Sequence, residues 1–338
     1  MAALRSASVG VERWSALRLF LMVAGPLFAI FLLTADYSRP YNIDAFSNVL
    51  PAWRMGSAGT VYLPDHVVLT EPQYLGNVSW VVPAQDSPVS KYPPGAALHA
   101  APLYAIWPDE AAIETVQGNN NPDAIPIEIL IPPFGPAAVA SALVVALAMG
   151  FLALSFRKLA GGRAALVAAY VAGLGTAAWS VAANALWQHG PGMMWIALAG
   201  TLAAGHLISS GFAYGMAILV RPVSAFVAAP AGLYMAWQER SWQPAAKVGI
   251  GAFLGLAVLV GYNAVVYGEP SVSGGYTGTF VDNATSLDMV SYLRNLALAL
   301  LSPTRGLLMW SPFLIILLPG LGAAWRSAPS WVRGGALG

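Results

Sequence analysis

Uncharged apolar runs of about 20 residues recur along the chain, and an α-helix of that length crosses the hydrocarbon core of a bilayer. We therefore predict an all-α fold, a polytopic transmembrane helical bundle of about eight spans, with part of a ninth span at the C-terminal end. The predicted spans cover residues 15–34, 134–156, 164–183, 191–208, 210–221, 223–237, 246–267 and 307–325.

The segment 191–237 leaves two arrangements open, because its apolar residues fit either three short helices or two long ones. Two helices would reverse the orientation of everything that follows. Three helices keep Lys247 and Arg326 on the same side as Arg157 and Lys158, as the positive-inside rule expects of cytoplasmic loops. We therefore expect three helices, a cytoplasmic N-terminus and an integral protein of a bacterial plasma membrane.

Two long polar stretches divide the predicted spans. We expect one membrane domain, 1–338, that ends inside its ninth span, as a C-terminally truncated chain would. Its parts are a first span at 15–34, an outside loop with interfacial helices at 35–133, spans two to seven at 134–267, a second outside loop at 268–306, and the last span with the end of the chain at 307–338.

Composition supports a membrane protein. Hydrophobic residues make up 57% of the chain and charged residues 9%, against about 25% charged in a soluble domain. The net charge of +1 argues against a nucleic-acid partner, and the absence of cysteine excludes disulfides and thiolate chemistry.

The acids lie outside the predicted spans. Of the 15 Asp and Glu residues, all but Glu12 and Glu239 fall in the two long polar stretches. A proton- or sodium-coupled transporter usually carries ionisable groups at mid-membrane. The distribution favours an enzyme with its site at the outer membrane surface, although a receptor-like or scaffolding protein would also fit.

The stretch around Asp44 predicts an amphipathic interfacial helix. Its apolar positions recur at spacings of three and four residues, and they are Ile43, Phe46, Val49, Leu50 and Trp53. Asp44 would stand at the N-terminus, where Asp is also a common helix cap. Pro51 is expected to kink or restart the helix.

Asp44, Phe46, Gly59 and Pro64 keep a spacing that resembles the first outside loop of the GT-C glycosyltransferases, such as the protein O-mannosyltransferases and the aminoarabinose transferases of lipid A. The resemblance implies that Asp44 is the general base that activates an acceptor. Ala45 departs from the family, which often has a second acid there.

Lys91 and Tyr92, ahead of Pro93 and Pro94, resemble the family's Lys-Pro-Pro or Tyr-Pro-Pro element. The resemblance implies substrate binding by both residues. Lys91 suits a lipid phosphate, although a Lys that snorkels at the interface gives the same pattern.

Three further residues are candidates for substrate binding. His189, in LWQHGPG, suits the wall of a site, although a lone His is more often structural. Arg221, near a span end, needs an anionic partner, which a lipid phosphate or a loop acid would supply. Arg305, in SPTRGL, resembles an element of bacterial GT-C-like proteins and could clamp phosphate or anchor the chain at the interface beside Trp310.

The resemblance implies an inverting glycosyltransferase that moves a hexose or pentose from a polyprenyl-phosphate donor to a lipid, glycan or protein acceptor. No cofactor is implied. Asp109 and Glu110 could assist a divalent metal, but they fit a solvated loop pair better, and no metal-ligand spacing occurs. The alternatives are a transporter or flippase of a lipid-linked glycan and a non-catalytic membrane scaffold.

Overall fold

The computed structural model describes residues 15–37, 43–64, 81–107, 110–116, 127–276, 286, 288–304 and 306–338. These residues form an all-α protein with two short β-hairpins. Within them, three helices are long and apolar enough to cross a membrane, and they are α1 (Ala16–Thr34), α5 (Gly135–Ala160) and α10 (Gln243–Tyr267).

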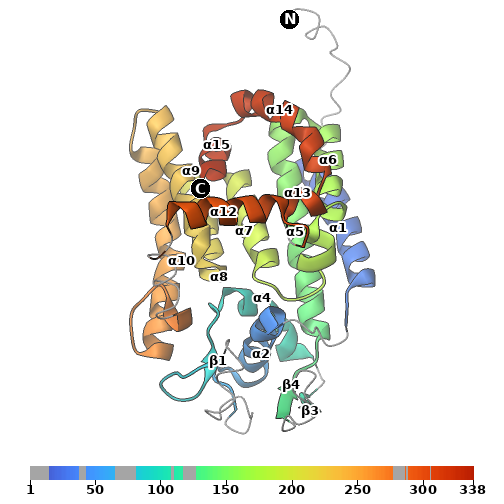
Figure 1. Cartoon of the computed structure of the whole chain (residues 1–338), viewed down its shortest axis with the longest axis vertical. Coiled ribbons are helices and arrows are strands. Elements are labelled where there is room, and N and C mark those ends of the chain that lie inside the picture. The colour runs from blue at the N-terminus through green and yellow to red at the C-terminus, as the bar shows by residue number, and fades with distance from the viewer. Residues whose placement is uncertain are drawn as a thin grey trace, which may run out of the picture.

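Shorter helices complete the bundle between α5 and α10 (Figure 1). They are α6 (Gly162–Leu174), a π-helical turn (Ala178–Ala182), α7 (His189–Leu202), α8 (Leu207–Val220), a 3-10 turn (Pro222–Ser224) and α9 (Ala225–Gln238). The segment 191–237 therefore contains three helices, as predicted.

The span count differs from the sequence prediction. The helix positions agree closely with the eight predicted runs, but only three helices have spanning length among the residues described. Helices α6 to α9 contain 13 or 14 residues each, or roughly 20 Å at 1.5 Å per residue, against a hydrocarbon core of about 30 Å. Turns at 175–177, 203–206 and 221–224 shorten them.

A compact layer closes one end of the bundle, which we call the loop end. It holds α2 (Ile43–Ala58), α4 (Gly95–Ile106) and the antiparallel pairs β1–β2 and β3–β4. The four strands are β1 (Val81–Val82), β2 (Val89–Ser90), β3 (Ala112–Val116) and β4 (Ile127–Ile131). In Figure 1 this layer lies below the upright helices.

Helix α2 is continuous through Pro51, so the helix does not restart there as one of the two predicted outcomes had it. Its apolar face packs on α4, where Val49, Ala52 and Ala97 are buried together. A Cβ at Gly56 would collide with the backbone of Ala101. This close packing compensates for the hydrogen bond that a proline cannot donate.

Helix α4 is in turn linked to the bundle. His99 Nδ1 lies 2.7 Å from the carbonyl oxygen of Gly95, and Trp195 Nε1 of α7 donates to His99 Nε2 at 3.0 Å. The acceptor role of Nε2 requires the proton on Nδ1, which then donates to Gly95. A Cβ at Gly95 would overlap the backbone of Val220, so α4 also begins directly against the end of α8.

Helices α8 and α10 meet along a seam of glycines. Gly211 and Gly215 on α8 face Gly251 and Gly255 on α10, and a Cβ at any of the four would collide with the backbone of the other helix. Small residues at four-residue spacing allow this approach in membrane helices. The seam fixes the two helices from which the site described below is partly built.

The last helices cover the outside of the bundle. They are α12 (Met289–Leu301), α13 (Leu307–Trp310), α14 (Phe313–Ser327) and α15 (Ser330–Leu337). Figure 1 shows α12 crossing the front of the upright helices and α14 at the end opposite the loop end. α15 packs on α9, where Gly334 touches the backbone of Pro230.

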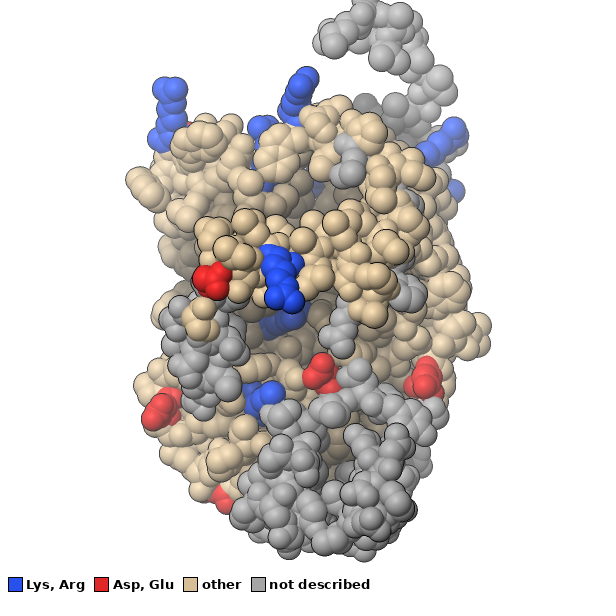
Figure 2. All heavy atoms as spheres, in the orientation of Figure 1, with Lys and Arg blue, Asp and Glu red and all other residues tan. Residues whose placement is uncertain are grey.

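Charge is distributed unevenly along the long axis. Among the residues coloured in Figure 2, several Lys and Arg side chains lie at the end opposite the loop end and others lie near the middle, whereas the Asp and Glu side chains lie in the middle and towards the loop end. A basic end is typical of the cytoplasmic side of a membrane protein.

Candidate functional site

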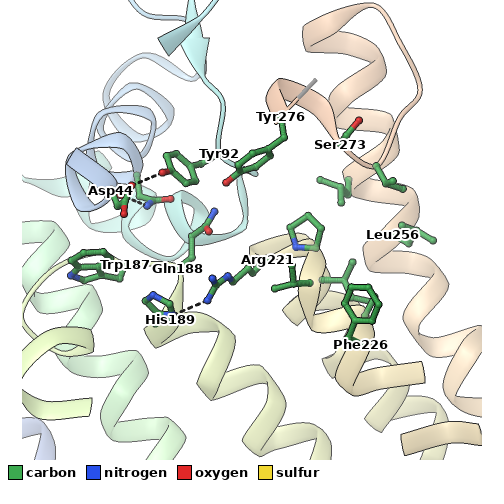
Figure 3. A pocket seen from close by; sticks show the side chains of 17 residues that line it. Asp44, Tyr92, Trp187, Gln188, His189, Arg221, Phe226, Leu256, Ser273 and Tyr276 are labelled. Atoms are coloured by element: carbon green, nitrogen blue, oxygen red, sulfur yellow. Dashed lines mark hydrogen bonds between the residues drawn. The ribbon is translucent and has the colours of Figure 1, made fainter. Parts of the chain in front are cut away.

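One cavity of about 520 Å³ lies between the loop end and the ends of α7, α8, α9 and α10 (Figure 3). Its lining divides into a polar part and an apolar part. The polar part consists of Asp44, Asn48, Tyr92, Trp187, Gln188, His189, Arg221, Ser273 and Tyr276. The apolar part consists of Ile218, Pro222, Val223, Ala225, Phe226, Leu256, Leu259 and Val272.

Asp44 lies in the first turn of α2 with its side chain exposed to the cavity. A carboxylate is favourable there because it complements the helix dipole. Its backbone oxygen accepts hydrogen bonds from Ser47 Oγ and Asn48 Nδ2, both at 2.7 Å. The local turn is thereby fixed, and the carboxylate position with it.

The Tyr92 hydroxyl donates to Asp44 Oδ1 at 2.5 Å, within the range of charge-assisted O–H···O⁻ bonds. Burial, the hydrogen bond to Asp44 and the charge of Asp44 together raise the pKa of Tyr92 well above its ordinary value. Tyr92 therefore stays protonated and acts as a donor that orients the carboxylate.

Arg221 enters the cavity from the break between α8 and α9. It follows the last residue of α8 in an extended conformation and precedes the 3-10 turn that begins at Pro222. Arg221 Nη1 donates to His189 Nδ1 at 2.9 Å. His189 is the first residue of α7, so the guanidinium, the imidazole and the positive end of a helix dipole meet on one side of the cavity.

The pKa of His189 lies below its ordinary value because burial disfavours the imidazolium and the charge of Arg221 adds to the effect, while Asp44 opposes it. Nδ1 of neutral His189 can accept the hydrogen bond that Arg221 donates. Arg221 is always charged, so this pair carries one positive charge opposite Asp44.

Tyr276 closes the cavity from the loop after α10. Burial is the main cause that raises the pKa of Tyr276 to about 12. Its ring meets that of Tyr92 edge to face, with centroids 5.8 Å apart. Asn263 Nδ2 of α10 donates to the carbonyl oxygen of Ser271 at 2.7 Å and holds this loop against α10.

Lys91 does not line the cavity. Its Nζ lies 5.7 Å from the ring centroid of Tyr92 and 5.8 Å from that of Tyr276, a cation–π arrangement. A Cβ at Gly275 would collide with Lys91, so the loop lies directly on this residue. The structure thus places Lys91 behind the two tyrosines and not on the cavity surface.

The structure brings Asp44, Tyr92, His189 and Arg221 to one cavity. Arg305 lies outside the described residues. Sequence reasoning missed Asn48, Trp187, Gln188, Ser273 and Tyr276. Trp187 and Gln188 adjoin His189 in LWQHGPG, and this clustering of an aromatic, an amide and an imidazole was the signal that could have found them.

A second groove of about 280 Å³ adjoins the apolar part of the cavity, and Ile218 and Ala225 line both. The remaining lining of this groove comes from α9 and α10, and consists of Ala228, Ala229, Gly232, Leu233, Ala245, Val248, Gly249 and Ala252. Small side chains leave room along the helices for a narrow apolar ligand.

Among the described residues, no group of three His, Cys, Asp or Glu side chains is arranged to hold a metal ion. The described lining offers one carboxylate, one guanidinium, one neutral imidazole and a set of hydroxyls and amides. No family model, curated protein or solved structure matches the chain.

Proposed function

We propose that this protein is a membrane glycosyltransferase that moves a sugar from a polyprenyl-phosphate donor to an acceptor. The observation that carries the proposal is one cavity that joins a carboxylate, a guanidinium and an apolar groove. A lipid-linked sugar phosphate has a polar ring, an anionic phosphate and an apolar chain in the same order.

The donor phosphate would lie against Arg221 and the start of α7. A guanidinium matches a phosphate in geometry and charge, and helix N-termini favour anions. His189 presents its Nδ1 to Arg221 and so orients the guanidinium. The lipid chain would run along the groove between α9 and α10, which supports lateral access from the bilayer.

Asp44 would act as the general base. An acceptor hydroxyl attacks the anomeric carbon, and its proton passes to the Asp44 carboxylate. The bond between that carbon and the phosphate oxygen breaks, and polyprenyl phosphate leaves with the electron pair. Attack opposite the leaving group inverts the anomeric centre. Tyr92 holds the carboxylate through its hydroxyl.

The membrane placement is part of the proposal. The loop end would lie outside and the basic end in the cytoplasm, together with the N-terminus, in a bacterial plasma membrane. Eight apolar segments would lie within the bilayer, with α6 to α9 crossing it as short helices joined by turns. The acceptor would be a lipid, glycan or protein at the outer face.

The test is transfer from polyprenyl-phosphate sugars by the full chain in nanodiscs. Asp44→Asn keeps the size of the side chain and removes the base, so we expect the rate to fall by roughly 10² to 10⁴ fold, the usual contribution of general acid–base catalysis. The matched control is Glu269→Gln, because Glu269 is an exposed acid near the loop end that does not line the cavity.

Equal rates for wild type and Asp44→Asn would remove Asp44 from the mechanism. Movement of the intact lipid-linked sugar between leaflets, without transfer by wild type, would favour the flippase alternative. Neither transfer nor movement would favour a scaffold.

A further inference from the structure

The turn between α9 and α10 holds an arginine in a backbone conformation that favours glycine. Arg240 has a φ of 49°, whereas the other described residues with positive φ are all glycines. The amide of Ser241 donates to the carbonyl oxygen of Ala236 at 3.0 Å, and the amide of Arg240 donates to that of Trp237 at 3.3 Å. These two bonds form the Schellman motif, whose left-handed position is usually occupied by glycine.

No contact within the described part of the chain accounts for an arginine at this position. The side chain of Arg240 is exposed and makes no hydrogen bond or ion pair with any described residue. A left-handed conformation is unfavourable for a residue with a Cβ, and such conformations concentrate at functional positions. The strain at Arg240 is therefore offset by nothing that the described residues supply.

Two exposed tryptophans flank Arg240. Trp237, in the last turn of α9, is 69% exposed, and Trp242, just before α10, is 76% exposed. The ring of Trp237 meets that of Tyr234 edge to face, with centroids 5.3 Å apart, and this contact orients it. Tryptophan is enriched at membrane–water interfaces, where its ring lies at the level of the lipid headgroups.

The two helices also expose apolar side chains next to the turn. Leu233 of α9 and Ile250 and Phe253 of α10 are all exposed. Because α10 is long and apolar enough to cross a membrane, this surface suits contact with acyl chains. The turn lies where that surface ends, at the end of the bundle opposite the loop end (Figure 1), which is the level of lipid headgroups.

The charges around the turn favour an anionic headgroup. Lys247 is exposed one turn into α10. The guanidinium of Arg333, on α15, lies over the ring of Tyr234, 6.0 Å from its centroid. Together with Arg240 these cations outnumber Glu239, the acid next to Arg240 in the chain. Lys and Arg side chains close to a bilayer are attracted to negatively charged lipids.

We propose that the turn between α9 and α10 binds the headgroup of an anionic phospholipid, with Arg240 on the phosphate and Trp237 and Trp242 beside the glycerol backbone. A guanidinium matches a phosphate in geometry and charge, and the left-handed backbone places it at the tip of the turn. This inference goes beyond the proposed transferase. It rests on placement in a bilayer and is tested without any measurement of sugar transfer.

The experiment measures thermal unfolding of the full chain in nanodiscs of phosphatidylcholine alone and of phosphatidylcholine mixed equally with phosphatidylglycerol. The quantity of interest is the rise in melting temperature that the anionic lipid adds, because a ligand of the folded state stabilises that state. Inorganic phosphate, added to the phosphatidylcholine nanodiscs, separates a lipid site from a site for free phosphate.

Two variants of Arg240 separate its charge from its backbone strain. Arg240→Gln removes the charge and keeps a long side chain, whereas Arg240→Gly removes both the charge and the strain. The matched control is Arg326→Gln. Arg326 is an exposed arginine in the last turn of α14, at the same end of the molecule, without a positive φ.

We expect phosphatidylglycerol to raise the melting temperature of wild type by roughly 2–4 °C, and inorganic phosphate to add nothing. Arg240→Gln and Arg240→Gly should lose most of this rise, and Arg326→Gln should keep it. In phosphatidylcholine alone, Arg240→Gly should melt about 1–2 °C above wild type, because glycine adopts the left-handed conformation without strain.

Equal losses in Arg240→Gln and Arg326→Gln would show a diffuse attraction of the basic end and overturn the site. A rise that inorganic phosphate reproduces, or no rise in wild type, would also overturn it.

A second measurement uses phosphatidylglycerol brominated near its headgroup, which quenches tryptophan fluorescence on contact. It should quench wild type more than phosphatidylcholine brominated at the same position does. The double variant Trp237→Phe, Trp242→Phe should lose this excess, and an excess that persists would place the bound lipid elsewhere.

Discussion

The two walls of the cavity are built in different ways. The wall that carries Asp44 and Tyr92 comes from the loop end and is held by hydrogen bonds from Asn48 to the backbone of Asp44 and from Tyr92 to its side chain. The opposite wall comes from α8, α9 and α10, and the glycine seam holds α8 to α10 by backbone approach. The residues proposed to act on the substrate are therefore largely different from those that pack the helices together. Substitutions should accordingly change activity and stability separately.

The largest effect after Asp44→Asn is expected at Arg221. Arg221→Gln removes the cavity's guanidinium, so affinity for polyprenyl phosphate should fall by roughly 10 to 100 fold, the worth of a charge-assisted contact. Arg221→Lys keeps the charge without the planar fork and should lose less. Equal lipid binding by all three proteins, measured in nanodiscs, would place the phosphate elsewhere.

At the glycine seam, Gly255→Leu should lower the stability of the fold. The new side chain would collide with the backbone of Gly215, and overpacking costs about 1–3 kcal/mol. The control is Gly261→Leu on the same helix, where a Cβ meets no atom within 4 Å. Thermal unfolding in detergent should show a lower melting temperature for Gly255→Leu alone. A similar decrease for both variants would contradict the close packing of α8 and α10 at Gly255.

Lys91→Met tests the edge of the wall that carries Asp44 and Tyr92. Because Lys91 contacts the two tyrosine rings, its loss should cost about 0.5–1 kcal/mol of stability and leave affinity for polyprenyl phosphate unchanged. Chemical denaturation and lipid binding measure the two effects. A tenfold loss of lipid affinity with unchanged stability would support the phosphate-binding role that the sequence predicts for Lys91.

The smallest expected effect is the contribution of His189 to the pH dependence of stability. Because the pKa of His189 is lowered in the folded protein, the unfolded chain binds the additional proton first as the pH falls. The stability from neutral His189 is therefore complete above about pH 6.5, the unperturbed value, and decreases below it.

His189→Asn offers Arg221 an acceptor that does not titrate. We expect the melting temperature of wild type to fall more than that of the variant between pH 7.5 and pH 5. Parallel curves would show that His189 does not contribute to the pH dependence. The difference between the two proteins is the measurement, since other groups titrate in both.

The positions of helices followed from local sequence. Apolar runs and the break at Arg221 predicted α5, α8 and α9 within a few residues, whereas α7 ends at Leu202, six residues before the predicted end of its span at 208. The unbroken α2 did not follow, because its packing on α4 outweighs the penalty at Pro51. The lengths of the helices, which determine how many of them can span a membrane, were also hard to predict. They depend on where short turns interrupt an apolar run.

The composition of the site was harder to predict than its elements. Asp44 meets Tyr92 and lies in the same cavity as Arg221 and Tyr276 only because four distant segments converge. Lys91 gives a second example of a contact that local sequence could not predict. The sequence predicts that Lys91 binds a phosphate, but it could not predict the contact of Lys91 with the ring of Tyr276, which lies 185 positions along the chain.

The link from His99 to Trp195 has a consequence for how a ligand reaches the site. Since α4 is bonded to α7 and begins against α8, Tyr92, His189 and Arg221 keep their spacing as a rigid frame. Widening of the cavity must then come from the rest of its lining, which includes Phe226 of α9 and Leu256 of α10. A molecule would enter and leave there, from the flank of the bundle.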